Sequence, residues 1–95
     1  MIVGCLELTL VIEGGAREKR AVVRRVSDRL RGRFPVSVAE TELLDDPLRA
    51  QLGVALVTND ARLAQSVLDK VRDFVVDDLL GRAEVVDERI EVVHV

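Results

Sequence analysis

Aromatic side chains are almost absent from this sequence. It has no tryptophan and no tyrosine, and its only aromatic residues are Phe34 and Phe74. Sheets that bind single-stranded RNA usually stack the bases on exposed strand aromatics, whereas both phenylalanines fall at a predicted helix end or within a predicted helix. The sequence therefore argues against base stacking, and any RNA binding would depend on charge and shape.

Cysteine and histidine each occur once. Cys5 has no partner for an internal disulfide, and a four-ligand zinc site needs more cysteines and histidines than this chain has. His94 is the only possible base for a Ser-His-Asp arrangement, and it lies near the end of the chain. Cys5 and His94 fall on neighbouring predicted strands but on opposite faces, so only a β-bulge would bring them together.

Acidic residues are adjacent at Asp45-Asp46 and at Asp77-Asp78. Carboxylates of this kind bind divalent cations or transfer protons in some sites, but in turns they are mostly solvated. We expect no enzymatic activity, no catalytic residues, no metal site and no cofactor.

Long hydrophobic runs are also missing, because no apolar stretch approaches the 18 residues of a membrane helix and no basic segment precedes the first predicted strand. We therefore expect a cytoplasmic protein without membrane span or signal peptide. A chain of 95 residues with 48% hydrophobic and 33% charged residues suits one globular domain, placed at residues 1–95.

Hydrophobic periodicity predicts six elements in the order strand, helix, strand, strand, helix, strand. Pro35 indicates an edge position for the second strand, whereas the third strand is apolar on both parities and is expected at the centre. A turn or short helical turn is expected at 43–50. The order is typical of an α+β, ferredoxin-like βαββαβ fold, in which two helices cover one face of a four-stranded antiparallel sheet. The predicted strands are 2–12, 36–43, 51–59 and 83–95, and the predicted helices are 16–31 and a second one that is capped by Asn59 or Asp60 and stops by Gly81.

Positive charge is concentrated in the first helix. Residues 17–33 carry a net charge of +6, and the rest of the chain carries −9. At about 100° per residue, several arginines share the side opposite the apolar stripe, as expected for a surface that attracts phosphate backbones. The candidate nucleic-acid-binding residues are Arg17, Lys19, Arg20, Arg24, Arg25, Arg29 and Arg31.

Two other interpretations of the basic helix stay open. Helices need a polar outer face, and arginine provides one with good helix propensity. The basic residues could also pair with the acidic second helix of another copy, which carries Asp69, Asp73, Asp77 and Asp78.

The sheet face opposite the helices is predicted to be small and apolar over much of its area. Monomers seldom expose a large apolar patch, so a two-fold homodimer is a simple way to cover it. The alternative is an exposed patch diluted by Glu7, Arg89 and Glu91. The candidate interface residues are Val3, Cys5, Val11, Ala39, Ala55, Val57 and Val93.

Gly14 and Gly15 precede the first helix and have some likeness to a phosphate-binding loop. They match no complete phosphate-binding motif, and turn geometry explains them better. A phosphate ligand at residues 15–19 nevertheless remains a lesser alternative, because a helix N-terminus attracts anions.

Four segments carry a family resemblance: MIVGCLELTLVIEG (1–14), EKRAVVRRVSDRLRGRFPVSVAE (18–40), LGVALVTND (52–60) and VLDKVRDFV (67–75). They resemble the bacterial YlxP-like family, a domain of unknown function numbered 503. The resemblance implies a ferredoxin-like fold and a gene setting among translation and ribosome-maturation genes, and it brings no established activity or catalytic residues. Family members commonly have a longer segment before the Lys-Arg pair, and an aromatic residue where this chain has 45–48.

Together these features predict a small non-enzymatic protein that contacts RNA or the ribosome through its first helix. The main alternative is a protein-binding or homodimeric module that uses the open sheet face, with no small-molecule substrate indicated by the sequence.

Overall fold

The first strand contributes apolar side chains to the hydrophobic core along its whole length. The computed structural model describes residues 1–95. In β1 (Ile2–Ile12), even-numbered residues are buried and odd-numbered residues are half-buried. This alternation places β1 between the helices on one side and an uncovered sheet face on the other.

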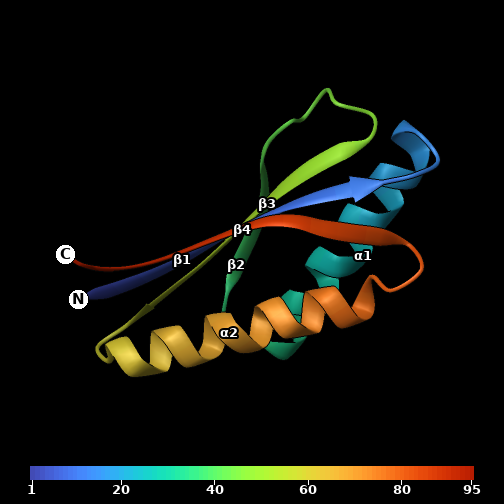
Figure 1. Cartoon of the computed structure of the whole chain (residues 1–95). Helices are drawn as coiled ribbons and strands as arrows, with labels where there is room; N and C mark the ends of the chain where they lie inside the picture. Colours follow the sequence, from blue (N-terminus) through green and yellow to red (C-terminus); the bar gives the residue numbers. More distant parts are fainter.

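The remaining elements complete the predicted order. They are α1 (Ala16–Arg33), β2 (Ser37–Glu42), β3 (Arg49–Thr58), α2 (Ala61–Asp78) and β4 (Ala83–His94). The strands form one antiparallel sheet in the order β2-β3-β1-β4, and both helices lie on the same side of it (Figure 1). The ferredoxin-like fold is confirmed, as are the edge position of β2 and the inner position of β3.

Two predicted boundaries differ from the structure by two residues, and both ends of β2 and the ends of β3 and β4 differ by one. The first helix continues through Gly32 to Arg33, and Phe34 ends it in an extended conformation while its N–H still donates to the Leu30 carbonyl at 2.9 Å. Pro35 explains this end, because a residue before proline avoids helical geometry. The third strand begins at Arg49 rather than at 51, since Arg49 pairs with Val11.

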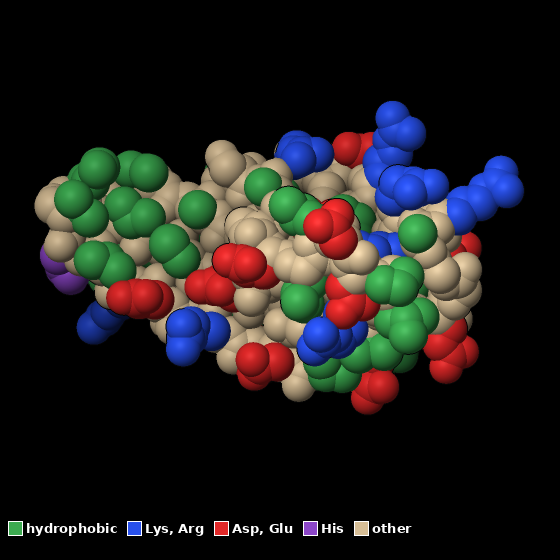
Figure 2. Space-filling view, turned by 90° about the horizontal axis from the view of Figure 1, so that it is seen from above, with side chains coloured by type: hydrophobic (Ala, Val, Ile, Leu, Met, Phe, Trp, Pro, Cys, Tyr) green, Lys and Arg blue, Asp and Glu red, His purple; other side chains and the backbone are tan.

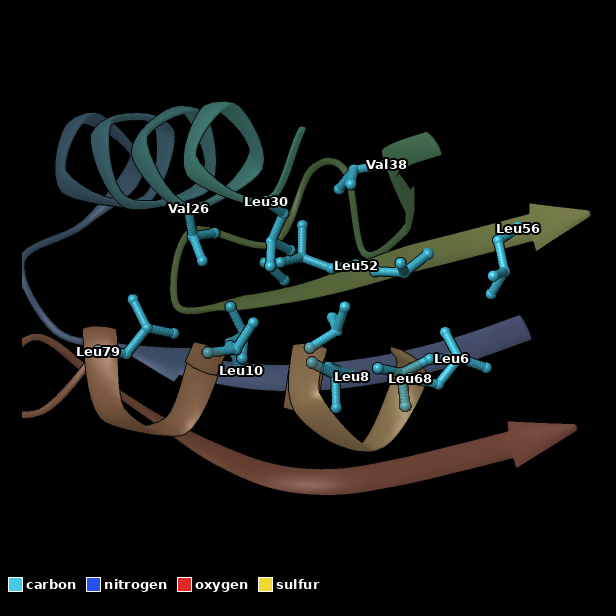
Figure 3. Close-up of a cluster of buried hydrophobic side chains, with 14 of the residues drawn as sticks. Leu6, Leu8, Leu10, Val26, Leu30, Val38, Leu52, Leu56, Leu68 and Leu79 are labelled. Carbon is cyan, nitrogen blue, oxygen red and sulfur yellow. The ribbon is translucent and has the colours of Figure 1, made fainter. Parts of the chain in front are cut away.

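A single cluster of 18 buried hydrophobic residues fills the space between the sheet and the helices. Figure 3 shows Leu6, Leu8 and Leu10 of β1 pointing toward leucine and valine side chains from both helices. Neither helix is long and apolar enough to cross a membrane.

Candidate functional site

The N-terminal half of α1 carries three exposed arginines that have no ion-pair partner. Gly14 and Gly15 have φ values of +109° and +84°, conformations that favour glycine, and they turn the chain from β1 into the helix. Arg17, Arg20 and Arg24 then follow on one side of α1, all exposed and without a hydrogen bond or ion pair to another side chain. We call these three residues the arginine face.

The other arginines of α1 have partners within the chain. Arg29 Nη1 lies 2.6 Å from Asp78 Oδ1, and Arg25 Nη2 lies 3.6 Å from the same oxygen. Only 6% of the Asp78 side chain is exposed, so this carboxylate joins α1 to α2 from a largely buried position. Of the four aspartates considered for pairing with another copy, Asp78 is therefore engaged within its own chain.

Arg31 and Arg33 are occupied as well. Arg31 donates to the Val38 carbonyl at 2.7 Å and lies 3.4 Å from Asp28, while the Arg33 guanidinium lies 4.7 Å from the centre of the Phe74 ring. The predicted set of basic residues thus divides into the free arginine face and a group engaged in internal contacts.

Lys19 is buried, and its inclusion among the exposed phosphate-binding residues was wrong. Its ammonium donates to the carbonyls of Leu43 and Asp46, each at 2.6 Å, and lies 3.0 Å from Glu40 Oε2. Only 4% of the residue is exposed. A lysine has three N–H donors, so these contacts leave it no free donor for a phosphate.

A signal for this burial was present in the sequence. Lys19 precedes Val22, Val26 and Leu30 by three, seven and eleven residues, and it therefore lies on the apolar stripe of α1. The charge of Lys19 suggested solvent exposure, whereas its position on the helix indicated burial.

The segment held by Lys19, residues 43–48, forms a turn rather than the short helical turn considered as one possibility. Leu43 has a φ of +61°, and Asp46 Oδ1 accepts from the N–H groups of Leu48 and Arg49 at 2.8 and 2.9 Å. Asp46 Oδ2 also accepts from Arg49 Nε at 2.9 Å. The Leu48 N–H, followed by the Arg49 side chain, holds the pKa of Asp46 below the ordinary aspartate value.

Residues with catalytic potential are not brought together. Cys5 pairs across the sheet with Ala55 and Glu91, whereas His94 pairs with Ile2 and so lies on the other face. The predicted separation of Cys5 and His94 is confirmed. The bulge between β1 and β4 falls at Thr9/Leu10, too far along the strands to change their parity.

The surroundings of Gly14 do not favour a phosphate ligand. A hollow of about 640 Å³ adjoins this glycine, but Glu13, Glu18 and Glu84 line it together with a single arginine, Arg82. Three carboxylates would repel an anion despite the nearby helix N-terminus.

The open sheet face has the predicted arrangement of residues. Val3 pairs with Val57 and Val93, and Ala39 pairs with Gly53, which places their side chains on the uncovered side. Figure 2 shows hydrophobic side chains gathered at the end of the molecule that holds the histidine, with acidic and basic side chains over the middle. Val11 belongs to the other end of the face, where it pairs with Arg49 and Glu84.

Solved structures of other proteins share the fold of this chain. A de novo designed protein with a ferredoxin fold is 16% identical, with a TM-score of 0.60 over 98% of this chain and 84% of the design. SnoaB, a cofactor-independent oxygenase from Streptomyces nogalater, is 11% identical, with a TM-score of 0.55 over 99% of this chain and 92% of SnoaB. At these identities both likenesses concern the fold alone.

Sequence comparison is more specific. The uncharacterized protein YlxP of Bacillus subtilis (strain 168) is 30% identical over 76 residues, which are 78% of this chain and 83% of YlxP. The family described as a protein of unknown function (DUF503) matches residues 3–90. The resemblance that the sequence segments indicated is confirmed, and the chain belongs to the DUF503 family.

Proposed function

We propose that this protein is a non-enzymatic RNA-binding protein that contacts the ribosome or its RNA through the arginine face. The proposal rests on one observation: Arg17, Arg20 and Arg24 have no ion-pair partner, whereas the other arginines of α1 contact groups within the chain. Guanidinium groups without a carboxylate partner are well suited to bind phosphates.

The spacing of the arginine face fits a phosphate backbone. With a rise of about 1.5 Å per residue, the Cα atoms of Arg17 and Arg24 lie roughly 10 Å apart along the axis, with Arg20 between them. Long flexible side chains can therefore reach several neighbouring phosphates. Contacts of this kind are independent of base sequence and weaken steeply as salt is added.

Charge directs RNA to the helical side of the molecule. The open sheet face carries Glu7, Asp87 and Glu91, which pair in register with neighbouring β1 and β4 residues and repel a phosphate backbone. At the arginine face three exposed arginines outnumber the neighbouring carboxylates of Glu18 and Glu40, so the local charge favours a phosphate backbone.

The ribosome is the first target because of the family. The YlxP-like resemblance implies a gene setting among translation and ribosome-maturation genes. The absence of enzymatic activity is part of the proposal, and the placement of Cys5 and His94 on opposite faces supports it.

Co-sedimentation with purified ribosomal subunits across a salt titration tests the proposal. The double variant Arg20→Glu/Arg24→Glu should lose most binding and reduce the log–log salt slope by roughly 1.5, since each phosphate contact contributes about 0.7 to 0.9. Its thermal stability should hardly change because both side chains are exposed.

The matched control is Arg62→Glu/Lys70→Glu, which makes the same change in net charge on exposed positions of α2. This control should retain the salt-sensitive binding. Equal loss of binding in both double variants, or wild-type binding by Arg20→Glu/Arg24→Glu, would refute the role of the arginine face.

A further inference from the structure

One end of the open sheet face is hydrophobic and uncovered. Val3, Val57 and Val93 form one cross-strand row, and 66% of Val57 is exposed. Met1 and Val95 extend the row, because the Val95 N–H donates to the Met1 carbonyl at 2.8 Å and both residues are more than 60% exposed. We call these five residues the valine end (Figure 2).

The rest of the open face differs in side-chain size between its two halves. The β2–β3 half presents Ala39, Gly53 and Ala55, which help to form the floor of a hollow of about 360 Å³. Thr41 also lines this hollow, as do Cys5 and Glu7 of β1. The β1–β4 half presents Glu7 paired with Arg89, and Cys5 paired with Glu91. One half of the face is therefore recessed, and the other carries longer side chains.

We propose that this face binds a second copy of the chain in a face-to-face homodimer. The two-fold axis would lie between the two sheets, parallel to the strands and above the gap between β1 and β3. The β1–β4 half of each copy then faces the β2–β3 half of the other. Val3 of one copy then meets Val57 of the other. Glu7 faces Gly53 of the other copy, at the recess that Ala39 and Ala55 help to form and beside the Thr41 side chain that packs against Gly53. Large side chains facing small ones are the condition for close packing of two sheets.

A second copy fits this face better than RNA does. The same surface supplies both the projecting and the recessed half, which is the property of an isologous interface. Glu7 would enter the interface beside its cross-strand neighbour Arg89, so that a negative and a positive side chain are buried next to each other. RNA would instead meet Glu7, Asp87 and Glu91.

The available area is sufficient for a stable dimer. The four strands have 11, 6, 10 and 12 residues. At about 4.8 Å between strands and roughly 3.3 Å per residue, they present on the order of 600 Å² on each copy. The total of about 1,200 Å² lies at the lower end of stable interfaces, which predicts a dimer that dissociates on dilution.

Sedimentation equilibrium over a range of protein concentrations tests this inference. The wild-type protein should approach twice its mass of 10.5 kDa at high concentration. Val57→Lys should raise the dimer dissociation constant about 100-fold, because two ammonium groups would be buried without partners at the two-fold interface. Circular dichroism should be unchanged, since Val57 is exposed in the single chain.

Leu80→Lys is the matched control, because Leu80 is 70% exposed and follows α2 on the helical side of the sheet. It should dimerise like the wild type. A wild-type monomer at all concentrations, a dimer that survives Val57→Lys, or loss of the dimer in both variants would each overturn the inference. None of these outcomes bears on RNA binding by the arginine face, which lies on the helical side.

Discussion

The two helices have the same length and cover the same side of the sheet, but they are attached to it by different interactions. α2 buries only apolar residues, namely Ala64, Leu68, Val71 and Val75. α1 buries Val22, Val26 and Leu30 together with Lys19 and Ser27. The N-termini differ as well, since Asp60 accepts from the N–H groups of Arg62 and Leu63, whereas α1 follows Gly15 without a side-chain cap.

The difference arises from what each helix covers. α2 packs mainly on β1, a long inner strand, and Gly4 permits a close approach. A Cβ atom at Gly4 would lie 3.1 Å from Leu68 Cδ1 and 3.2 Å from Ala64 Cβ. α1 instead lies beside β2, a six-residue edge strand followed by the 43–48 turn. The carbonyl groups of that turn need donors, and Lys19 provides them.

Loss of apolar packing under α2 should have the largest effect on stability. Leu68→Ala removes a fully buried side chain and should lower the free energy of unfolding by about 3 kcal/mol. Leu63→Ala, at a half-exposed position of the same helix, should cost far less. Urea unfolding of both variants measures the difference, and similar losses would contradict the one-sided attachment of α2.

Removal of the ammonium group under α1 should have a smaller but clear effect. Lys19→Met keeps the length of the side chain and leaves the Leu43 and Asp46 carbonyls without their donor, at a cost of about 2 kcal/mol. Lys70→Met, an exposed lysine of α2, is the control and should change little. Hydrogen exchange should increase in residues 43–48 of Lys19→Met only, and unchanged exchange there would show that Lys19 does not hold the turn.

The smallest expected effect concerns the pH dependence of the same turn. Because the pKa of Asp46 is lowered on folding, its carboxylate stabilises the folded state above the ordinary aspartate range, and this contribution is lost as the pH falls through the lowered pKa. Asp46→Asn should be less stable near neutral pH and should lose less stability on acidification. Asp45→Asn, at an exposed position, is the control, and identical acid profiles for the two variants would contradict this role.

Local patterns were sufficient for the elements and the topology. The order of the elements and most of their boundaries followed from three local features. These are the alternation in β1, the apolar spacing of both helices, and Pro35 and Gly81 at the ends of elements. The parity of Cys5 and His94 was also correct, because strand register follows from the same alternation.

Local sequence patterns could not predict the contacts that the charged residues make. Asp78 and Arg29 are 49 residues apart, and Lys19 meets Leu43 across 24 residues. Their contacts depend on how α1 packs beside α2 and the 43–48 turn, which no local periodicity records. Only the position of Lys19 on the apolar stripe gave a local sign that one of the basic residues was internal.

The hydrogen bond from Arg31 to the Val38 carbonyl has a consequence for the behaviour of the protein at high concentration. β2 is an edge strand, and unpaired backbone groups on such a strand are a template for uncontrolled pairing with other chains. Arg31 occupies one of these groups and places a positive charge at the edge, next to the bulge between Glu40 and Glu42. The contact leaves one fewer unpaired acceptor on the shortest strand of the sheet, and a positive charge at an edge strand disfavours pairing with another chain.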